Sequence, residues 1–264
     1  MNTDKTNNHT PPKATTKLCL EKPCKGNPYQ PARLYLSGYD IEELAEKCDP
    51  VDALFLMFTG EFAKNQEDKQ LLANLQVMLS IPSPRHPAAR AAMSSGVSKT
   101  SEEHLLPISL MALGGTQSGA LEVKASIDFI VEHLDEPAED VADKLAASWR
   151  DKHKHIAPGF GQLYGSPDSL SSSFLKKIVP LKPEGRILNW VCRFNAKLKE
   201  YDAGVLDVGL AASVFHELSF GGRESVGLYQ LLRAPGLLAY AMEQTHNPVS
   251  AMPMLEDEQY ALTK

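Results

Sequence analysis

The sequence has little of several features that mark specialised classes of protein. Its four cysteines are scattered, which excludes a disulfide scaffold and leaves zinc without a second pair of suitably spaced ligands. Acidic residues outnumber basic ones by 33 to 27, and no basic stripe occurs, which argues against nucleic acid as a partner. No apolar run approaches the roughly 18–20 residues that span a bilayer, so we expect no membrane partner.

The N-terminal segment has no apolar core of the kind that a secretory signal carries, so we expect a protein of the reducing cytoplasm. Residues 1–29 are predicted to be disordered or loosely ordered, since residues 1–17 are rich in Thr, Asn, Lys and Pro. The remaining composition, 43% hydrophobic and 23% charged, is ordinary for a globular protein. The length allows one large domain or two modest ones.

Helical periodicity with boundary signals covers most of the chain. Asp49 can cap a helix that begins at Pro50 and ends before Gly60, and Asn65 can cap the next. One short strand is predicted at residues 33–38. Further helices are predicted over residues 88–94, 105–113, 119–133, 137–154, from 168 onward, 184–199, 205–220 and 223–244. The absence of alternating strands and helices makes the fold class all-α.

The segment from Ala157 to Asp168 contains the most informative motif. Pro158, Gly159, Phe160 and Gly161 form a glycine-rich loop, and glycine allows a backbone to approach a ligand closely because it has no Cβ. Such a loop can cradle a cofactor, or it can simply be a tight turn. Gln162 follows at its end, where a side chain would reach the reacting group.

Five segments in order resemble the citrate synthase superfamily, in particular its short citryl-CoA lyase-like form. The loop at residues 158–161 matches the family's "PGFGH" up to the last position. The other four are residues 38–44, 54–61 (similar to "LLLxGEL"), 88–96 (a helix of small residues) and 232–244 (similar to "ARTAGLIAHALEE").

The resemblance implies an all-helical homodimer whose subunits have a large and a small domain. We expect the large domain to comprise residues 30–150 and 223–264, and the small one residues 151–222. The implied activity joins or cleaves a carbon–carbon bond between a CoA thioester and a di- or tricarboxylic acid. Coenzyme A thioester would be a co-substrate, with no metal and no permanently bound cofactor.

The sequence departs from the family where the chemistry lies. Gln117 stands at the histidine of "HGGA", and Gln162 at the histidine of "GFGH". Asp168 matches the aspartate of "DPR", whose arginine is missing. Val208 falls on the aspartate of "NVD", and Asp207 lies one residue earlier, a step of about 100° on a helix. Arg233 is retained as a clamp for a carboxylate.

Several readings of the altered site remain open. Glutamine can hold an oxygen by donating its amide N–H, but it carries no proton, which costs general-acid catalysis about 10²–10⁴-fold. Asp207, His153 or His155 could replace the missing base, although both histidines also suit a solvated helix end. The protein is therefore an enzyme acting on CoA thioesters, an impaired homologue that binds a ligand or partners an active subunit, or a scaffold without a CoA site.

Overall fold

The computed structural model of the chain describes residues 16–149, 155–253 and 259. The predicted all-α class is confirmed, since helices dominate and the strands are few. The contacts divide the chain into two compact units, residues 1–63 and 64–264. The division expected at residues 150 and 223 stays a prediction. None of the described helices is long and apolar enough to cross a membrane.

The first unit contains a β-hairpin that the sequence did not indicate. Strand β1 (Cys19–Cys24) pairs antiparallel with β2 (Asn27–Leu36), which pairs with the two-residue β3 (Tyr39–Asp40). The prediction of a single strand at residues 33–38, preceded by a loosely ordered segment up to residue 29, is therefore wrong for residues 19–29. The hairpin's exposed side chains give no alternating pattern, which explains the error.

Two helices complete the first unit, and their boundary signals act as predicted. Helix α1 spans Ile41–Lys47, and α2 spans Pro50–Thr59. The Asp49 side chain accepts from the backbone N–H of Val51 and of Asp52, and the Asp52 side chain accepts in return from the Asp49 N–H. Gly60 ends α2 with a φ of +79°, a conformation that glycine adopts without strain.

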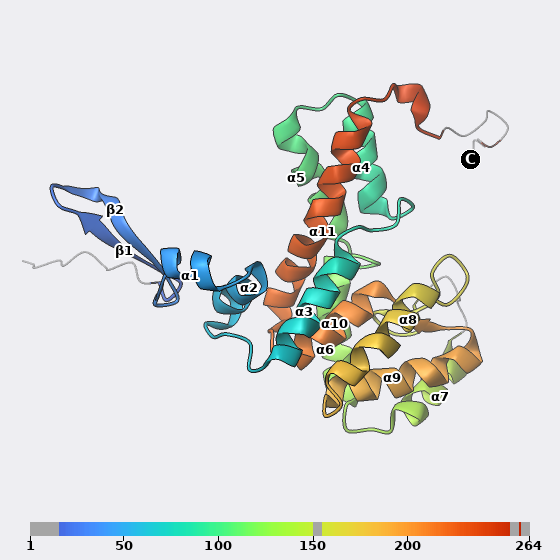
Figure 1. The fold of residues 1–264 in the computed structure, drawn as a ribbon. Coiled ribbons are helices and arrows are strands. Elements are labelled where there is room, and N and C mark those ends of the chain that lie inside the picture. Colours follow the sequence, from blue (N-terminus) through green and yellow to red (C-terminus); the bar gives the residue numbers. More distant parts are fainter. Residues whose placement is uncertain (1–15, 150–154, 254–258, 260–264) are drawn as a thin grey trace, which may run out of the picture. The chain divides into compact units, whose positions relative to one another are not determined.

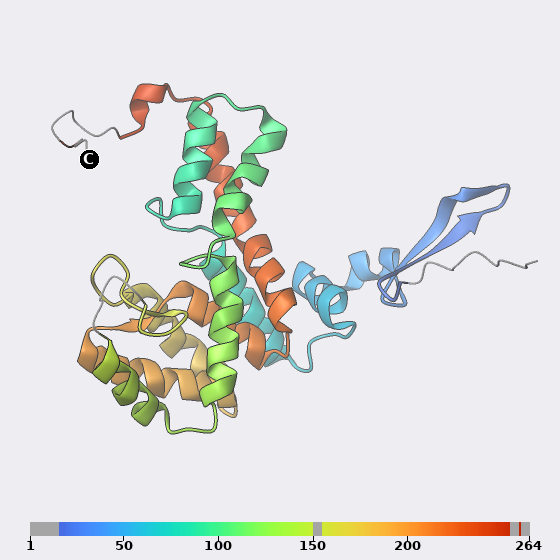
Figure 2. The ribbon, with the colours of Figure 1, turned by 180° about the vertical axis from the view of Figure 1, so that it is seen from behind.

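The second unit is a bundle around one long helix (Figures 1 and 2). Helix α11 contacts α3, α4, α5, α6 and α10, so the helix predicted at residues 223–244 is confirmed and lies at the centre of this bundle. The elements are α3 (Gln66–Leu79), α4 (Pro87–Val97), α5 (Glu102–Leu113), α6 (Ala120–His133), α7 (Ala138–Ser148), β4 (Phe160–Gly161), α8 (Ser169–Ile178), α9 (Arg186–Leu198), β5 (Gly204–Val205), α10 (Asp207–Glu217) and α11 (Gly222–Gln244). Helix α7 ends at Ser148, earlier than the expected residue 154.

Small residues let α11 approach its neighbours closely. A Cβ on Gly96 of α4 would lie 2.2 Å from the carbonyl oxygen of Ala241, and one on Gly236 would lie 2.2 Å from that of Ser80. Real Cβ contacts are never this short, so both positions require glycine. The small residues at 88–96 thus serve close helix packing.

An aromatic cluster joins the glycine-rich loop to two helices. Phe160 of β4 packs edge-on against Phe194 of α9 with ring centroids 4.9 Å apart, and Phe129 of α6 lies 5.9 Å from Phe160. Trp190 stacks on Phe194 at 4.9 Å. Because these rings are almost fully buried, the cluster fixes the loop against the bundle.

Candidate active site

The glycine-rich loop is shaped by the packing of the bundle. Gly159 has a φ of +78°, and a Cβ there would lie 2.2 Å from Ser126 Oγ and 2.6 Å from Gly209 Cα. The Gly159 carbonyl also accepts from the Leu206 N–H at 2.9 Å, and β4 pairs with β5 alongside. The close approach that requires glycine is therefore an approach to α6 and α10.

The four residues predicted to bind a cofactor, 158–161, differ in whether they reach a cavity. Phe160 is fully buried in the aromatic cluster, and Gly161 is buried beside it in β4. Pro158 lines a cavity together with Ile156 and Ala157. The open side of this loop is thus its beginning, residues 156–158, rather than the glycines.

Glu122 of α6 ties three segments together with a buried carboxylate. Oε1 accepts from the Gly159 N–H at 2.8 Å, and Oε2 accepts from the Ser118 N–H at 2.5 Å. The Nδ1 of His155 is its third partner. A carboxylate that is only 3% exposed needs such donors to offset its lost hydration.

His155 is oriented by this contact. Its Nδ1–H donates to Glu122, which leaves Nε2 as the nitrogen with a lone pair. The ring is 14% exposed and lines two cavities, so it is neither a core histidine nor a freely solvated one. His153 lies outside the described residues.

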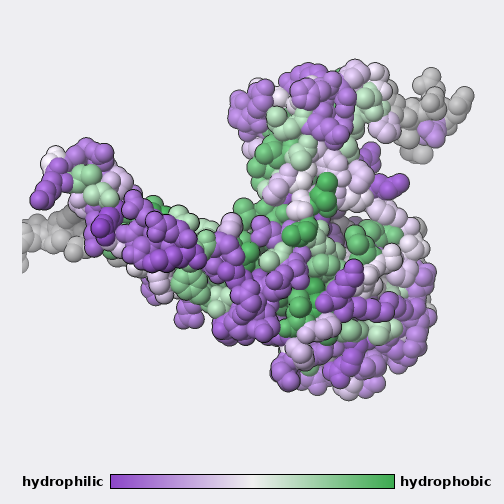
Figure 3. Space-filling model, viewed as in Figure 1, coloured by the Kyte–Doolittle hydropathy of each residue, from purple (hydrophilic) through white to green (hydrophobic). Residues whose placement is uncertain are grey.

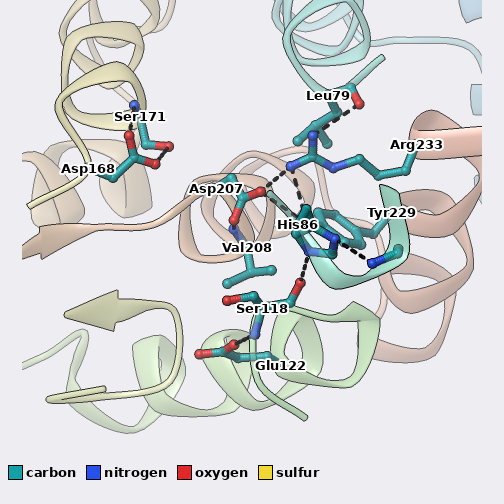
Figure 4. A network of polar contacts seen from close by, with 11 residues as sticks. Leu79, His86, Ser118, Glu122, Asp168, Ser171, Asp207, Val208, Tyr229 and Arg233 are labelled. Carbon is teal, nitrogen blue, oxygen red and sulfur yellow. Dashed lines mark hydrogen bonds and ion pairs between the residues drawn. The ribbon is translucent and has the colours of Figure 1, made fainter. Parts of the chain in front are cut away.

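The residue after Gln117, Ser118, has a strained backbone and is fixed by two hydrogen bonds. Ser118 has a φ of +55°, its N–H is bound by Glu122, and its carbonyl accepts from His86 Nε2 at 2.8 Å (Figure 4). Backbone strain of this kind persists only where the surroundings impose it. The exposed Gln117 side chain makes no hydrogen bond within the part of the chain that the structure describes, so its amide is available to a ligand.

His86 has both ring nitrogens occupied by the backbone. Nδ1 accepts from the Ala88 N–H at 3.1 Å and caps α4, which requires Nε2 to be the protonated nitrogen that donates to Ser118. Sequence reasoning overlooked this residue, although Pro87 directly after it is a signal for the first position of a helix.

Gln162 is held differently from Gln117. Its amide nitrogen donates to the Asp202 carbonyl at 2.9 Å and to the Asp202 carboxylate at 3.1 Å. The amide hydrogens are therefore engaged within the protein, and the amide oxygen is the atom left for a ligand. Gln162 lines the same cavity as Gln117.

Asp207, the first residue of α10, forms an ion pair with Arg233, which lies in the middle of α11 (Figure 4). The side chains are 25% and 4% exposed. Arg233 Nη1 also donates to the Leu79 carbonyl at 3.3 Å, and Nη2 to the Tyr229 hydroxyl at 3.3 Å. Val208 is fully buried and points away from the pair.

Burial and neighbouring charges shift the pKa values of Arg233 and Tyr229. Burial by itself lowers the pKa of the Arg233 guanidinium, but Tyr229 and Asp207 outweigh it, and the pKa is raised. Burial also raises the pKa of the Tyr229 hydroxyl, and the Asp207 charge adds to the effect. Arg233 is therefore a permanent cation whose carboxylate partner is Asp207.

Asp168 caps α8. One oxygen accepts from the Leu170 N–H at 3.0 Å and the Ser171 N–H at 3.1 Å, and the other accepts from Ser171 Oγ at 2.5 Å. It nevertheless lines a cavity with Asp207 and Arg233. This capping role accounts for its presence without a ligand.

Three adjoining cavities bring most of the predicted residues together. Cavity A, about 390 Å³, is lined by Gln117, Gln162, His155 and His86. Cavity B, about 420 Å³, shares Gln117 and His155 with cavity A and extends to residues 156–158. Cavity C, about 110 Å³, shares His86 and Ser118 with cavity A and holds Asp168, Asp207 and Arg233.

The search of known structures identifies the fold. The citryl-CoA lyase from Hydrogenobacter thermophilus superposes with a TM-score of 0.74 at 18% identity, over 95% of this chain and 94% of that one. A citrate synthase from Thermotoga maritima gives 0.53 at 14% identity, over 95% and 94%. The chain therefore has a citrate synthase-like, citryl-CoA lyase-like fold, as the sequence motifs predicted.

A third structure is larger. The ATP citrate lyase from Methanothrix soehngenii, solved "in complex with citrate and coenzyme A", gives 0.69 at 14% identity over 96% of this chain, which spans 44% of that one. No protein-family model and no curated protein matches the sequence.

Proposed function

We propose that the protein binds a CoA thioester and a di- or tricarboxylic acid and makes or breaks the carbon–carbon bond next to the thioester carbonyl. The observation that carries this proposal is the junction of cavities A and B, which Gln117 and His155 both line. An amide donor and an imidazole at one place are what enolate chemistry needs: a donor for the oxygen and a group that moves the proton.

The shape of the site suits a two-part substrate. Cavity B runs along residues 156–158 and would take the thioester arm, while cavity C, with its buried Arg233, would take a carboxylate. The citryl-CoA lyase-like fold supports this assignment, because similar structures were solved with coenzyme A and citrate, and with carboxymethyl coenzyme A and oxaloacetate.

Proton exchange at the α-carbon tests the chemistry directly. We expect the methyl protons of acetyl-CoA to exchange with deuterated water when the protein and an oxo-acid are present, followed by NMR or mass spectrometry. Gln117→Leu keeps the approximate size and removes the donor, which costs about 10²–10³-fold in rate. An absence of exchange with every oxo-acid tried would remove the catalytic proposal.

A second candidate is a homologue that binds its ligand without turnover. The pairing of Arg233 with Asp207 favours it, since the cation that would clamp a ligand carboxylate is already neutralised. This candidate predicts that coenzyme A raises the melting temperature by ligand linkage while acetyl-CoA shows no exchange.

We also infer that the chain forms a homodimer. Apolar surface lies along the face of the second unit seen in Figure 3, and Val77 of α3 and Leu231 and Met242 of α11 are exposed. Apolar residues exposed on neighbouring helices are typical of subunit interfaces. Sedimentation equilibrium that gives a monomer at micromolar concentration would contradict this inference.

A further inference from the structure

We propose that His155, oriented by Glu122, takes and returns the proton at the carbon next to the thioester carbonyl. This inference rests on the proposed function and assigns the step that the two glutamines cannot perform. Neither Gln117 nor Gln162 titrates, so a proton carrier has to come from another residue that lines the same cavities.

The contact with Glu122 prepares His155 for this step. Because Nδ1–H donates to the carboxylate, Nε2 carries the lone pair and is the ring nitrogen that can take a proton. Glu122 is itself fixed by the N–H groups of Ser118 and Gly159, so the ring cannot rotate without breaking that network. Glu122 is thus a positioning residue.

Two other titratable groups beside these cavities, a histidine and an aspartate, are already engaged. His86 uses Nδ1 as an acceptor and Nε2 as a donor to the backbone, and Asp207 is paired with Arg233. Within the described residues, His155 Nε2 has no hydrogen-bond partner. His155 Nε2 is therefore a nitrogen at the junction of cavities A and B whose lone pair can accept a proton.

The step balances without a further reactant. Nε2 removes a proton from the α-carbon, the C–H bond breaks, and its electron pair moves onto the thioester oxygen to give the enolate. The Gln117 amide N–H stands at the same junction and can bind that oxygen. Return of a deuteron from the exchanged imidazole to the carbon completes one exchange and restores the ring.

The experiment compares three variants in the acetyl-CoA exchange assay, with CoA affinity measured by calorimetry. We expect His155→Gln to lower the exchange rate by about 10²–10⁴-fold while its CoA affinity stays within twofold. His155→Ala opens space for added imidazole, which should restore part of the rate. His133→Gln is the matched control, because His133 forms a second histidine–glutamate pair, with Glu136 at 2.7 Å, that lines none of the three cavities.

The outcomes separate the two proposals. An exchange rate in His155→Gln equal to that of the unaltered protein overturns the role of His155 and leaves the proposed function standing. Loss of exchange that imidazole does not restore in a His155→Ala protein that still binds CoA assigns His155 a structural role and also overturns the inference. Absence of exchange in the unaltered protein overturns the proposed catalysis itself.

Discussion

Replacing Asp207 by asparagine would test the ion pair that neutralises the buried Arg233. The change keeps the shape of the side chain and removes its charge, so Arg233, which is 4% exposed, becomes a buried cation without a counter-ion. Removing one partner of a buried pair costs about 3–5 kcal/mol, and we expect the lower end, about 3 kcal/mol, because Asp207 is a quarter exposed. At about 2–4 °C per kcal/mol for a protein of this size, the melting temperature falls by about 6–12 °C.

Urea unfolding, followed by circular dichroism, measures the free energy difference. The matched control is Asp135→Asn, which breaks an ion pair with Arg186 at the surface. The Arg186 and Asp135 side chains are 65% and 89% exposed, so this change should leave the unfolding midpoint unchanged. Equal unfolding midpoints for Asp207→Asn and the unaltered protein would refute the claim that Arg233 depends on Asp207. Citrate should stabilise Asp207→Asn more than the unaltered protein, because its carboxylate can replace the missing one.

Three further predictions concern backbone strain, helix capping and pH dependence. Gly159→Ala places a Cβ 2.2 Å from Ser126 Oγ and should cost more than 2 kcal/mol in unfolding free energy, whereas Gly165→Ala, at a φ of +83° with open space around it, should cost only the backbone strain of about 1–2 kcal/mol. Asp49→Ala removes a capping box and should cost about 1 kcal/mol by the same measurement. Burial lowers the pKa of His216 in the folded state, so the unfolded state binds its proton first and stability falls as the pH drops through about 6.5; His216→Gln should flatten that part of the curve of melting temperature against pH.

The helices were predictable because their signals are local. Asp49, Asn65 and Gly60 mark helix ends through hydrogen bonds and backbone angles that involve residues within a few positions. The hairpin at residues 19–36 was not, because its side chains are exposed on both faces and leave no alternation to detect. Its register rests on backbone pairing and on the contact of Lys22 with the Tyr35 ring across the hairpin, which composition does not report.

The candidate site was predictable in part, and the missing part is the contacts between segments distant in sequence. Gln117 and Gln162 were identified, and both line cavity A. The pairing of His155 with Glu122, however, joins residues 33 positions apart and depends on how α6 packs against the glycine-rich loop. The engagement of Gln162 by Asp202 depends likewise on a loop 40 residues away.

The one-residue step at Asp207 shows how a helix end alters such reasoning. A step of about 100° was expected to turn Asp207 from the site, yet Asp207 is the first residue of α10, where the side chain reaches past the helix end toward α11. Arg233 in cavity C therefore faces two carboxylates, Asp168 and Asp207, before any ligand arrives. A ligand carboxylate has to displace Asp207 from Arg233, and the energy of that separation is subtracted from its affinity. The ion pair thus favours a homologue that binds without turnover, and the rate of proton exchange is the measurement that distinguishes such a homologue from an active enzyme.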